Sequence, residues 1–468
     1  MKTLNPTTKL VVCIVLAACT VLAACASAEN TNPAFDPTTP VSTAPPDVAR
    51  PDTTVVVPDV TVTIDEGPPV VTQLSNGVTH GQHSADAWQD AHAITKAWSY
   101  LDRNKFLQNQ HMMGWGALSP EPSPGEYDWT TLDDRINVIR HTGGEPVITL
   151  CCSPDWMKGG EAGQTDWSKI EKAPDLKHYD DFANLAAAVA SRYPDVKYFQ
   201  VWNELKGFYS VDKKRWDYEH YTYLYNKVYD AVKKVRPDAQ LGGPYAVMES
   251  YPDEASTPHP SGIRGDWGVL DQASIDVVNY WLKNKHGAEF ISIDAKTMAR
   301  DGHLVTDEFT ATTKFTAITE MLRKKTDLPI WWSEWFVTPK DAGWDPDHQN
   351  AVMTTAVIRL ASAGATTALL WQPEGQPNHC GTCLWPSTTT SAGGDATPFG
   401  DSLQAFAWAF PPGTVLKPTT SSDSHVVALA SDARAVLVNT SDKHLTVRLV
   451  SAIVELAPYQ VAYIKIEK

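Results

Sequence analysis

The sequence predicts an α/β protein, with a (β/α)₈ TIM barrel followed by a small C-terminal antiparallel β-sandwich domain. Between residues 75 and 404, short β-branched runs alternate with longer stretches whose apolar residues recur at helical spacing, which is the pattern of βα units around a parallel sheet. Eight such units match a closed barrel. An open doubly wound sheet usually carries a glycine-rich phosphate turn after its first strand, and "HGQHSAD" at 80–86 is not such a turn.

The elements follow in a regular order. Runs such as "EPVITLCC" read as buried strands, and stretches such as "HYDDFANLAAAVASRY" read as helices with one apolar face. The predicted strands lie at 76–84, 106–116, 145–152, 196–204, 239–245, 288–296, 328–336 and 366–375. The predicted helices lie at 85–102, 178–193, 221–235, 274–285, 315–325 and 349–365.

The pattern changes after residue 405. From 405 to 468 the chain consists of short alternating runs separated by turn residues, for example "HVVALAS" and "ARAVLVNTS". This predicts the β-sandwich. The early run "TTVVVPDVTVTI" begins at residue 53, and strands from 53–72 could join this domain.

The N-terminal sequence predicts that the protein is exported. An apolar run from Leu10 to Ala24 follows Lys2 and Lys9, and it is too short to span a bilayer comfortably. It contains "LAAC" twice, ending at Cys19 and at Cys25, and this resembles a bacterial lipoprotein signal. We expect residues 1–25 to be that signal and Cys25 to be lipidated; an ordinary signal peptide is the alternative. Residues 26–58, rich in Pro and Thr, have no apolar period and predict a disordered tether.

Composition limits the partners. The net charge is −16 and the sequence pI is about 5.3, which argues against nucleic acid, because phosphates attract Lys and Arg. The 17 Trp and 16 Tyr residues of this exported chain favour a carbohydrate partner. A membrane contact is expected only through the N-terminal lipid.

Four cysteines lie beyond the signal. Disulfides are allowed in an exported protein, so Cys380 and Cys383 could close a small loop, and the adjacent Cys151 and Cys152 could pair with each other. A metal site made of all four is the alternative. The "CGTC" stretch lacks the strand-then-helix setting of a thioredoxin-like motif.

Two glutamates carry the chemistry. "VWNE" ends the fourth predicted strand at Glu204, and "WWSEW" ends the seventh around Glu334. Catalytic groups of such barrels lie at the C-terminal strand ends, where strands four and seven face each other across the mouth. A protonated acid opposite an ionised carboxylate suits glycosidic bond cleavage.

These residues resemble a known family. Trp-Asn-Glu on strand four with a second Glu on strand seven is the pattern of the retaining clan GH-A glycoside hydrolases. "PEPSPGEYDWTTLDDRI" at 120–136, "GGPY" at 242–245 and the small C-terminal β domain make the chain most similar to glycoside hydrolase family 39, which contains β-xylosidases and iduronidases.

The resemblance implies roles. Glu204 would be the general acid/base and Glu334 the nucleophile, while Asn203 would donate to the sugar 2-hydroxyl. Trp371, at the end of strand eight, would form an apolar floor. Other residues at strand ends could line the cleft or bind hydroxyls: Trp115, Trp156, Tyr245, His80 and His83.

The sequence also departs from the family. Many clan members carry a His and a Tyr at the end of strand six, where the Tyr hydrogen-bonds the nucleophile. Here "ISIDAK" places Asp294 and Lys296 in that region, where they could bind additional sugar hydroxyls or form a salt bridge. The sugar specificity of β-xylosidases therefore should not be assigned to this protein from the resemblance alone.

The sequence favours a glycosidase that acts on an extracellular or cell-wall polysaccharide or oligosaccharide, with xylosidase-like or furanosidase-like specificity. The alternatives are a surface lipoprotein that binds carbohydrate without cleaving it, and a structural surface protein that binds through its β domain. No cofactor or metal is expected, because two carboxylates suffice and no His/Asp cluster has ligand spacing. The oligomeric state is not predicted.

Overall fold

The computed structural model describes residues 58–466, apart from 66, 83, 87–88, 338–342 and 378. The predicted signal with Cys25, the tether up to residue 57, and His83 lie outside the described residues. Within the described ranges, no helix combines the length and apolar character that a membrane crossing requires.

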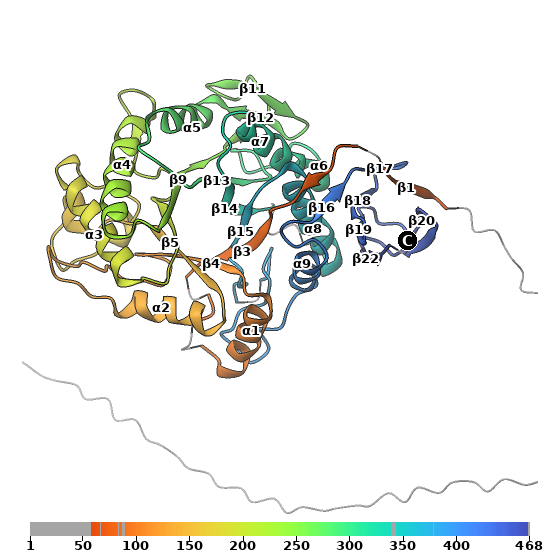
Figure 1. The fold of residues 1–468 in the computed structure, drawn as a ribbon, viewed down its shortest axis with the longest axis horizontal. Helices are drawn as coiled ribbons and strands as arrows, with labels where there is room; N and C mark the ends of the chain where they lie inside the picture. The colour runs from red at the N-terminus through yellow and green to blue at the C-terminus, as the bar shows by residue number, and fades with distance from the viewer. Residues whose placement is uncertain are drawn as a thin grey trace, which may run out of the picture. The chain divides into compact units, whose positions relative to one another are not determined.

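Eight parallel strands close into a barrel, which confirms the predicted fold class (Figure 1). All eight correspond to predicted strands. In order around the barrel they are β3 (Ser75–Thr79), β4 (Leu107–His111), β5 (Glu145–Leu150), β6 (Tyr198–Val201), β9 (Gln240–Val247), β13 (Phe290–Lys296), β14 (Ile330–Phe336) and β15 (Thr367–Trp371), which pairs with β3 again.

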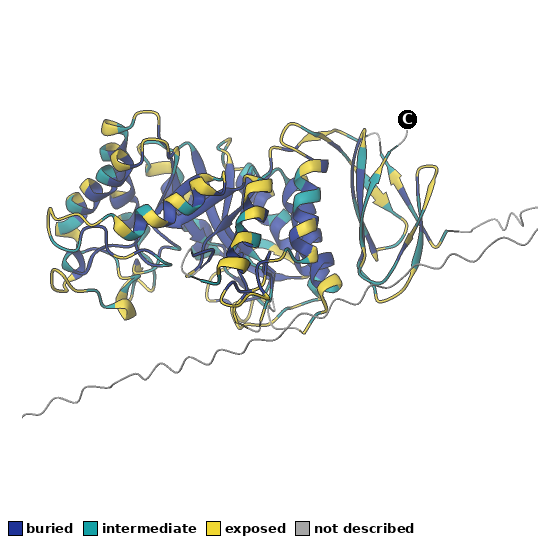
Figure 2. Cartoon of the chain, turned by 90° about the horizontal axis from the view of Figure 1, so that it is seen from below, coloured by how far each residue is buried: buried dark blue, intermediate teal, exposed yellow. Residues whose placement is uncertain are grey.

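Helices surround the barrel and turn their buried faces toward it, with exposed residues on the outside (Figure 2). They are α1 (Ala91–Asn104), α2 (Thr130–His141), α3 (Tyr179–Arg192), α4 (Tyr218–Val235), α5 (Gln272–Asn284), α6 (Glu308–Ala311), α7 (Thr313–Arg323), α8 (Pro346–Ala363) and α9 (Pro398–Ala409). Short 3₁₀ turns lie at Asp155–Lys158, Trp167–Lys169 and Leu176–His178.

Three helices of the described chain were not among the predicted ones: α2, the four-residue α6 and α9. In α2 the apolar spacing of Leu132, Ile136 and Ile139 is interrupted by charged residues, one of which, Arg135, is itself buried. Helix α9 starts with a proline after the capping Thr397 and continues to Ala409, so it runs through residue 405, where the sequence placed the domain boundary.

The barrel interior is layered. At its N-terminal end, buried apolar side chains pack together, among them Phe290 and Trp331, whose rings stack with centroids 4.1 Å apart. Above them lies a ring of buried polar side chains joined by hydrogen bonds: Thr79, Asn109, Thr149, Gln200 and Ser333. Each ring member satisfies its neighbours, as buried polar groups require, so the ring is a fixed base for whatever stands above it.

The C-terminal strands form two sheets. One has the order β17 (Thr419–Ser421), β1 (Val60–Ile64), β20 (Leu445–Leu449) and β21 (Ala452–Leu456). The other has the order β2 (Val70–Val71), β16 (Val415–Lys417), β18 (Val426–Ser431), β19 (Arg434–Asn439) and β22 (Val461–Lys465). The early segment thus supplies β1 and β2, and β1 pairs with β20 in parallel, unlike the other pairs of these sheets.

This domain packs on α8 and α9. The Tyr463 hydroxyl donates to the Ser402 carbonyl over 2.8 Å, and the Arg434 guanidinium lies 3.5 Å from the centre of the Trp408 ring. Smaller sheets lie in barrel loops: the β7 (Tyr209–Ser210) and β8 (Arg215–Trp216) hairpin, and the three strands β10 (Ser250–Tyr251), β12 (Gly268–Asp271) and β11 (Pro260–Gly265).

Candidate active site

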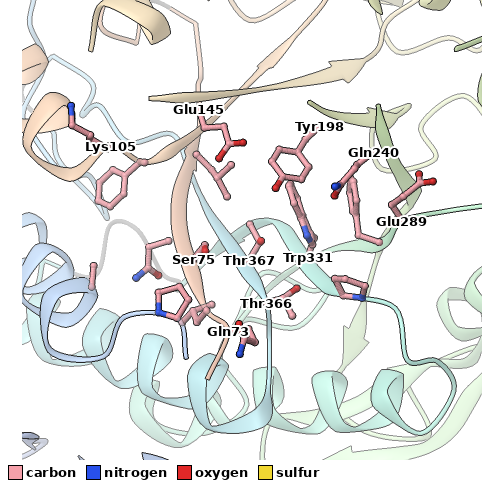
Figure 3. Close-up of a pocket in the computed structure, with 18 of the residues that line it drawn as sticks. Gln73, Ser75, Lys105, Glu145, Tyr198, Gln240, Glu289, Trp331, Thr366 and Thr367 are labelled. Carbon is pink, nitrogen blue, oxygen red and sulfur yellow. The ribbon is translucent and has the colours of Figure 1, made fainter. Parts of the chain in front are cut away.

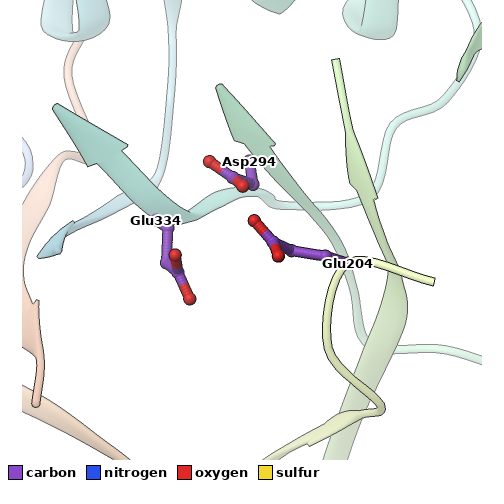
Figure 4. Close-up of side chains that lie close together, drawn as sticks. All are labelled: Glu204, Asp294 and Glu334. Carbon is purple, nitrogen blue, oxygen red and sulfur yellow. The ribbon is translucent and has the colours of Figure 1, made fainter. Parts of the chain in front are cut away.

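Three carboxyl groups meet at the C-terminal end of the barrel (Figure 4). They belong to Glu204 after β6, Asp294 on β13 and Glu334 on β14, and one oxygen of each lies within 4.8 Å of the other two. Glu204 and Glu334 are the pair that the sequence singled out, and Asp294 lies close to both. Oxygens at this spacing could also surround a cation, but an ammonium, a phenol and a carboxyl hydrogen bond already contact them.

A β-bulge turns Glu334 into the barrel. Regular alternation along β14 would place Ser333 and Glu334 on opposite faces. The register with β13 skips one residue, because Ile293 pairs with Trp332 and Asp294 pairs with Glu334. The extra residue, Ser333, lets both side chains reach the interior, and bulges commonly re-aim a side chain next to an active site.

A second bulge places Tyr245. On β9 the register skips this residue, since Pro244 pairs with Ser292 and Ala246 with Ile293. Tyr245 has a φ of 54°, and its fully buried phenol donates to Glu334 Oε1 over 2.6 Å. The sequence placed Tyr245 in the cleft wall; the structure places it behind Glu334. Many members of the clan that the sequence resembles carry a tyrosine at strand six; here the tyrosine that contacts Glu334 comes from the fifth barrel strand, β9.

The turn after β6 presents Glu204. Trp202, Glu204 and Leu205 all have positive φ values, of 72°, 51° and 50°, a conformation that costs energy in non-glycine residues. The buried Trp202 ring holds this turn, because its Nε1 donates to the Lys206 carbonyl over 2.8 Å and its ring packs edge-on against Phe182. Strain concentrated at this turn is typical of a functional site.

Lys206 lies beside Glu204. Its Nζ is 2.5 Å from Glu204 Oε2 and 2.6 Å from Glu171 Oε1. Burial by itself raises the pKa of Glu204, but the hydrogen bond from Asp294 and the charge of Lys206 outweigh it and leave this pKa below its usual value. The sequence analysis did not single out Lys206, although "WNELKG" shows it two positions after the glutamate.

Asp294 is the carboxyl of the cluster whose pKa is raised. Its residue is 5% exposed. Burial, followed by the charge of Glu204 and its hydrogen bond to Glu204, raises the pKa of Asp294 well above its usual value. Like charges at this distance cannot all ionise, so the cluster contains a carboxylic acid next to carboxylates.

Two buried polar groups at the mouth are unsatisfied. Asn203 Oδ1 and both ring nitrogens of His111, at the end of β4, make no hydrogen bond of good geometry among the described residues, although the Asn203 and His111 side chains lie against each other. Burial lowers the pKa of His111 to about 4, so the ring is neutral. Buried unsatisfied groups are rare in native proteins and call for an explanation, such as a catalytic role or a bound water or ion. The sequence proposed Asn203 as a sugar contact but did not single out His111.

Aromatic rings flank this end of the barrel. Trp115 lies against His111 with ring centroids 4.1 Å apart and meets Trp371 edge-on at 6.3 Å. Both tryptophans are partly exposed. A cavity of about 500 Å³ borders Trp115 and the half-exposed Trp167. The structure thus brings Trp115 and Trp371 together.

Three other candidates lie differently. His80 is buried with both ring nitrogens occupied, by Ser84 Oγ at 2.8 Å and Gln108 Oε1 at 2.9 Å, so it supports the barrel framework and has no free nitrogen for a hydroxyl. Trp156 donates to the Glu121 carbonyl within the loops. Lys296 is half-buried at the end of β13, and its carbonyl accepts from Lys314 Nζ over 2.9 Å.

The four cysteines form two disulfides. Cys151 is joined to Cys152, and Cys380 to Cys383. The alternative metal site made of all four is therefore excluded.

A cavity of similar size lies at the opposite end of the barrel (Figure 3). It measures about 500 Å³ and is lined by residues at strand starts, among them Glu145, Tyr198 and Gln240. It contains none of the three clustered carboxyls. In barrels of this fold the N-terminal end serves stability and the C-terminal end serves chemistry, so this cavity is not the candidate active site.

The family comparison agrees with the geometry. A family model described as glycosyl hydrolases family 39 matches residues 120–369, more than half of the chain. A curated protein named beta-xylosidase, from Caldicellulosiruptor saccharolyticus, is 23% identical over 247 residues. That alignment covers 50% of this chain and 46% of the relative, so the chain spans about half the length of the protein it matches.

Solved structures share the fold. A monomeric beta-xylosidase from Caulobacter crescentus CB15 superimposes with a TM-score of 0.55 at 17% identity, covering 84% of this chain and 83% of that one. A conserved exported protein from Bacteroides fragilis superimposes with a TM-score of 0.60 at 13% identity, covering 87% and 100%. At these identities the similarity concerns the fold alone.

Proposed function

Because the chain belongs to glycosyl hydrolase family 39, we propose that it is a retaining glycosidase that cleaves O-glycosidic bonds of an extracellular or cell-wall polysaccharide or oligosaccharide. The observation that carries the proposal is the approach of the Glu204 and Glu334 oxygens to within 4.8 Å. Carboxyl groups about 5 Å apart suit double displacement, whereas inverting enzymes need about 6.5–9.5 Å to admit a water between them.

The proposed reaction has two steps. A Glu334 oxygen attacks the anomeric carbon while protonated Glu204 gives its proton to the leaving oxygen, which forms a glycosyl ester on Glu334. Glu204, now a carboxylate, then takes a proton from water as that water attacks the same carbon and releases Glu334. The Tyr245 phenol, 2.6 Å from Glu334, orients the nucleophile in both steps.

The sugar would lie among the groups that lack partners. The Asn203 amide and the His111 ring can bind hydroxyls, and Trp115 and Trp371 can cover the apolar face of a ring. Two relatives bear the name beta-xylosidase, so β-xylosides are the first substrates to test, followed by furanosides.

The test is a panel of nitrophenyl glycosides, α and β, pyranosides and furanosides, with proton NMR of the first-formed anomer. We expect one sugar to be released with retention and its release to be lost in Glu334→Gln. Inversion would overturn the nucleophile assignment. Ligand binding by titration without any product, on aryl glycosides and on polysaccharides, would support a carbohydrate-binding protein instead.

We also propose that the enzyme is exported and held at a membrane by a lipid on Cys25. The "LAAC" ending at Cys25, followed by a polar segment, supports this location. Incorporation of labelled fatty acid should be lost in Cys25→Ala and kept in Cys19→Ala, the matched control. Labelling that survives Cys25→Ala would contradict the proposal.

A further inference from the structure

The third carboxyl of the cluster has no role in a two-carboxylate mechanism. Asp294 is almost fully buried at the end of β13, and its carboxyl group points toward those of Glu204 and Glu334 in Figure 4. It is hydrogen-bonded to Glu204. A buried acidic group that faces two others is costly unless it carries a proton or serves a purpose.

Its charged and titratable surroundings come from several elements. Glu204 and Lys206 face it from the turn after β6, Tyr245 from β9, Glu334 from β14 and Lys314 from α7, while Lys296 follows it on its own strand and His111 faces Glu204 from β4. Burial lowers the pKa of Lys314 to about 8, and its Nζ is bound to Ser250 Oγ and the Lys296 carbonyl. Lys206 is therefore the cation in contact with the Glu204–Asp294 pair.

This arrangement creates a problem for the general acid. Cleavage needs a proton on Glu204, yet the Lys206 ammonium at 2.5 Å favours the ionised form of Glu204. The proton of the pair is instead on Asp294, whose pKa is raised by burial and by its neighbours. Such a pair titrates as a unit, and its last proton is held more tightly than either carboxyl would hold it alone.

We propose that Asp294 is a positioning residue that stores the catalytic proton for Glu204, with which it shares one proton through their hydrogen bond; this inference rests on the proposed glycosidase function. When the leaving oxygen reaches Glu204, the shared proton moves from Asp294 to Glu204 and from Glu204 to that oxygen, so Glu204 is again a carboxylate. Asp294 becomes a carboxylate. The attacking water later returns a proton to Glu204 and, through it, to Asp294, so the cycle closes without net gain or loss.

The test compares the pH dependence of kcat/KM in the wild type, Asp294→Asn and Lys206→Met. In Asp294→Asn the neighbouring acid is gone, so Glu204 loses its proton more easily. We expect the alkaline limb to move to lower pH by about one unit or more, with a larger rate loss for poor leaving groups than for activated ones. In Lys206→Met the ammonium no longer favours the carboxylate form, so the limb moves to higher pH.

Glu374→Gln is the matched control, because Glu374 is a buried carboxyl at the same end of the barrel but outside the cluster. The alkaline limb of the kcat/KM profile should not move in this variant. An alkaline limb that stays in place or rises in Asp294→Asn would overturn the proposal, as would a limb that falls in Lys206→Met. If Asp294→Asn does not fold, the infrared measurement on the wild type, with Glu374→Gln as its control, decides.

Infrared spectroscopy separates this inference from the proposed function. At neutral pH we expect a carboxylic-acid carbonyl band in the wild type that disappears in Asp294→Asn and persists in Glu374→Gln. Absence of this band would overturn proton storage even if the enzyme is active. If the band is present but the protein cleaves no glycoside, Asp294 does carry a proton and the proposed glycosidase function is wrong.

Discussion

Glu334 and Glu374 are both buried carboxyls at the ends of neighbouring barrel strands, yet their surroundings are opposite. Glu374, just after β15, accepts hydrogen bonds from the Ala85 and Thr388 amides, the Thr388 hydroxyl and the Trp385 indole, at 2.7–3.1 Å. These donors come from the loops after β3 and β15. Glu334 receives the Tyr245 phenol but also faces two other carboxyl groups.

The difference distinguishes a buried carboxylate that stabilises the fold from buried carboxyls that serve a reaction. A carboxylate surrounded by neutral donors is satisfied and ties loops together, so its removal should cost stability. Carboxyls that face one another repel, and the fold keeps them close only because other interactions hold them there. The following predictions use this comparison, from the largest expected effect to the smallest.

Replacing the proposed nucleophile should separate activity from stability most clearly. We expect Glu334→Gln to lower kcat by roughly 10⁴-fold or more, because no covalent intermediate can form. Its thermal midpoint should stay equal to that of the wild type or rise, because one charge leaves the cluster while an amide oxygen can still accept from Tyr245. Steady-state kinetics and calorimetry on the same preparation check both. A large loss of stability would mean that Glu334, like Glu374, stabilises the fold.

Replacing the general acid should produce a loss that depends on the leaving group. Glu204→Gln should lose about 10²–10⁴-fold with alkyl or nitrophenyl glycosides. With dinitrophenyl glycosides, whose leaving oxygen needs little protonation, the rate of the first step should fall much less. Pre-steady-state kinetics on the two substrate classes measure this ratio, and equal losses would contradict the acid role.

The Tyr245 phenol should affect Glu334 with little effect on the fold. Tyr245→Phe removes a hydrogen bond to a charged group, which contributes about 1.5–3 kcal/mol. Without that bond the Glu334 oxygen is held less firmly in line with the anomeric carbon, so we expect kcat/KM to fall roughly tenfold to a hundredfold. Kinetics beside Tyr209→Phe, a half-exposed tyrosine, give the comparison, and an unchanged kcat/KM would remove Tyr245 from the mechanism.

Glu374→Gln should have the converse effect. The amide NH₂ would face N–H and O–H donors, so the free energy of unfolding should fall by about 1–3 kcal/mol, while kcat of the folded enzyme stays unchanged. Denaturant titration beside Glu320→Gln, an exposed residue of α7, measures the difference. A large drop in kcat without loss of stability would mean that the two regions do not differ as argued.

Much of the site could be predicted because the C-terminal ends of all strands in a parallel barrel lie at the same end of the barrel. Asn203 and Glu204 lie at the end of the predicted fourth strand, and Glu334 and Trp371 lie near the ends of the predicted seventh and eighth strands, so their common location follows from strand order. The partners of Glu204 were harder to find. Lys206 contacts Glu204 across a turn in which Trp202, Glu204 and Leu205 have positive φ values, which the sequence does not show. His111 is one of four buried polar residues in a strand that reads "LQNQH".

The sequence by itself determined the barrel, the strand ends that carry the two glutamates, and the family to which the chain belongs, because periodicity and local motifs are properties of neighbouring residues. The tertiary structure alone decided which way Tyr245 and Glu334 point, since a bulge breaks the alternation on which strand faces are predicted. It also decided which carboxyl carries the proton. Charge state depends on burial and on neighbours that are distant in sequence, here Glu204, Asp294 and Lys206, and only the closed barrel brings them together.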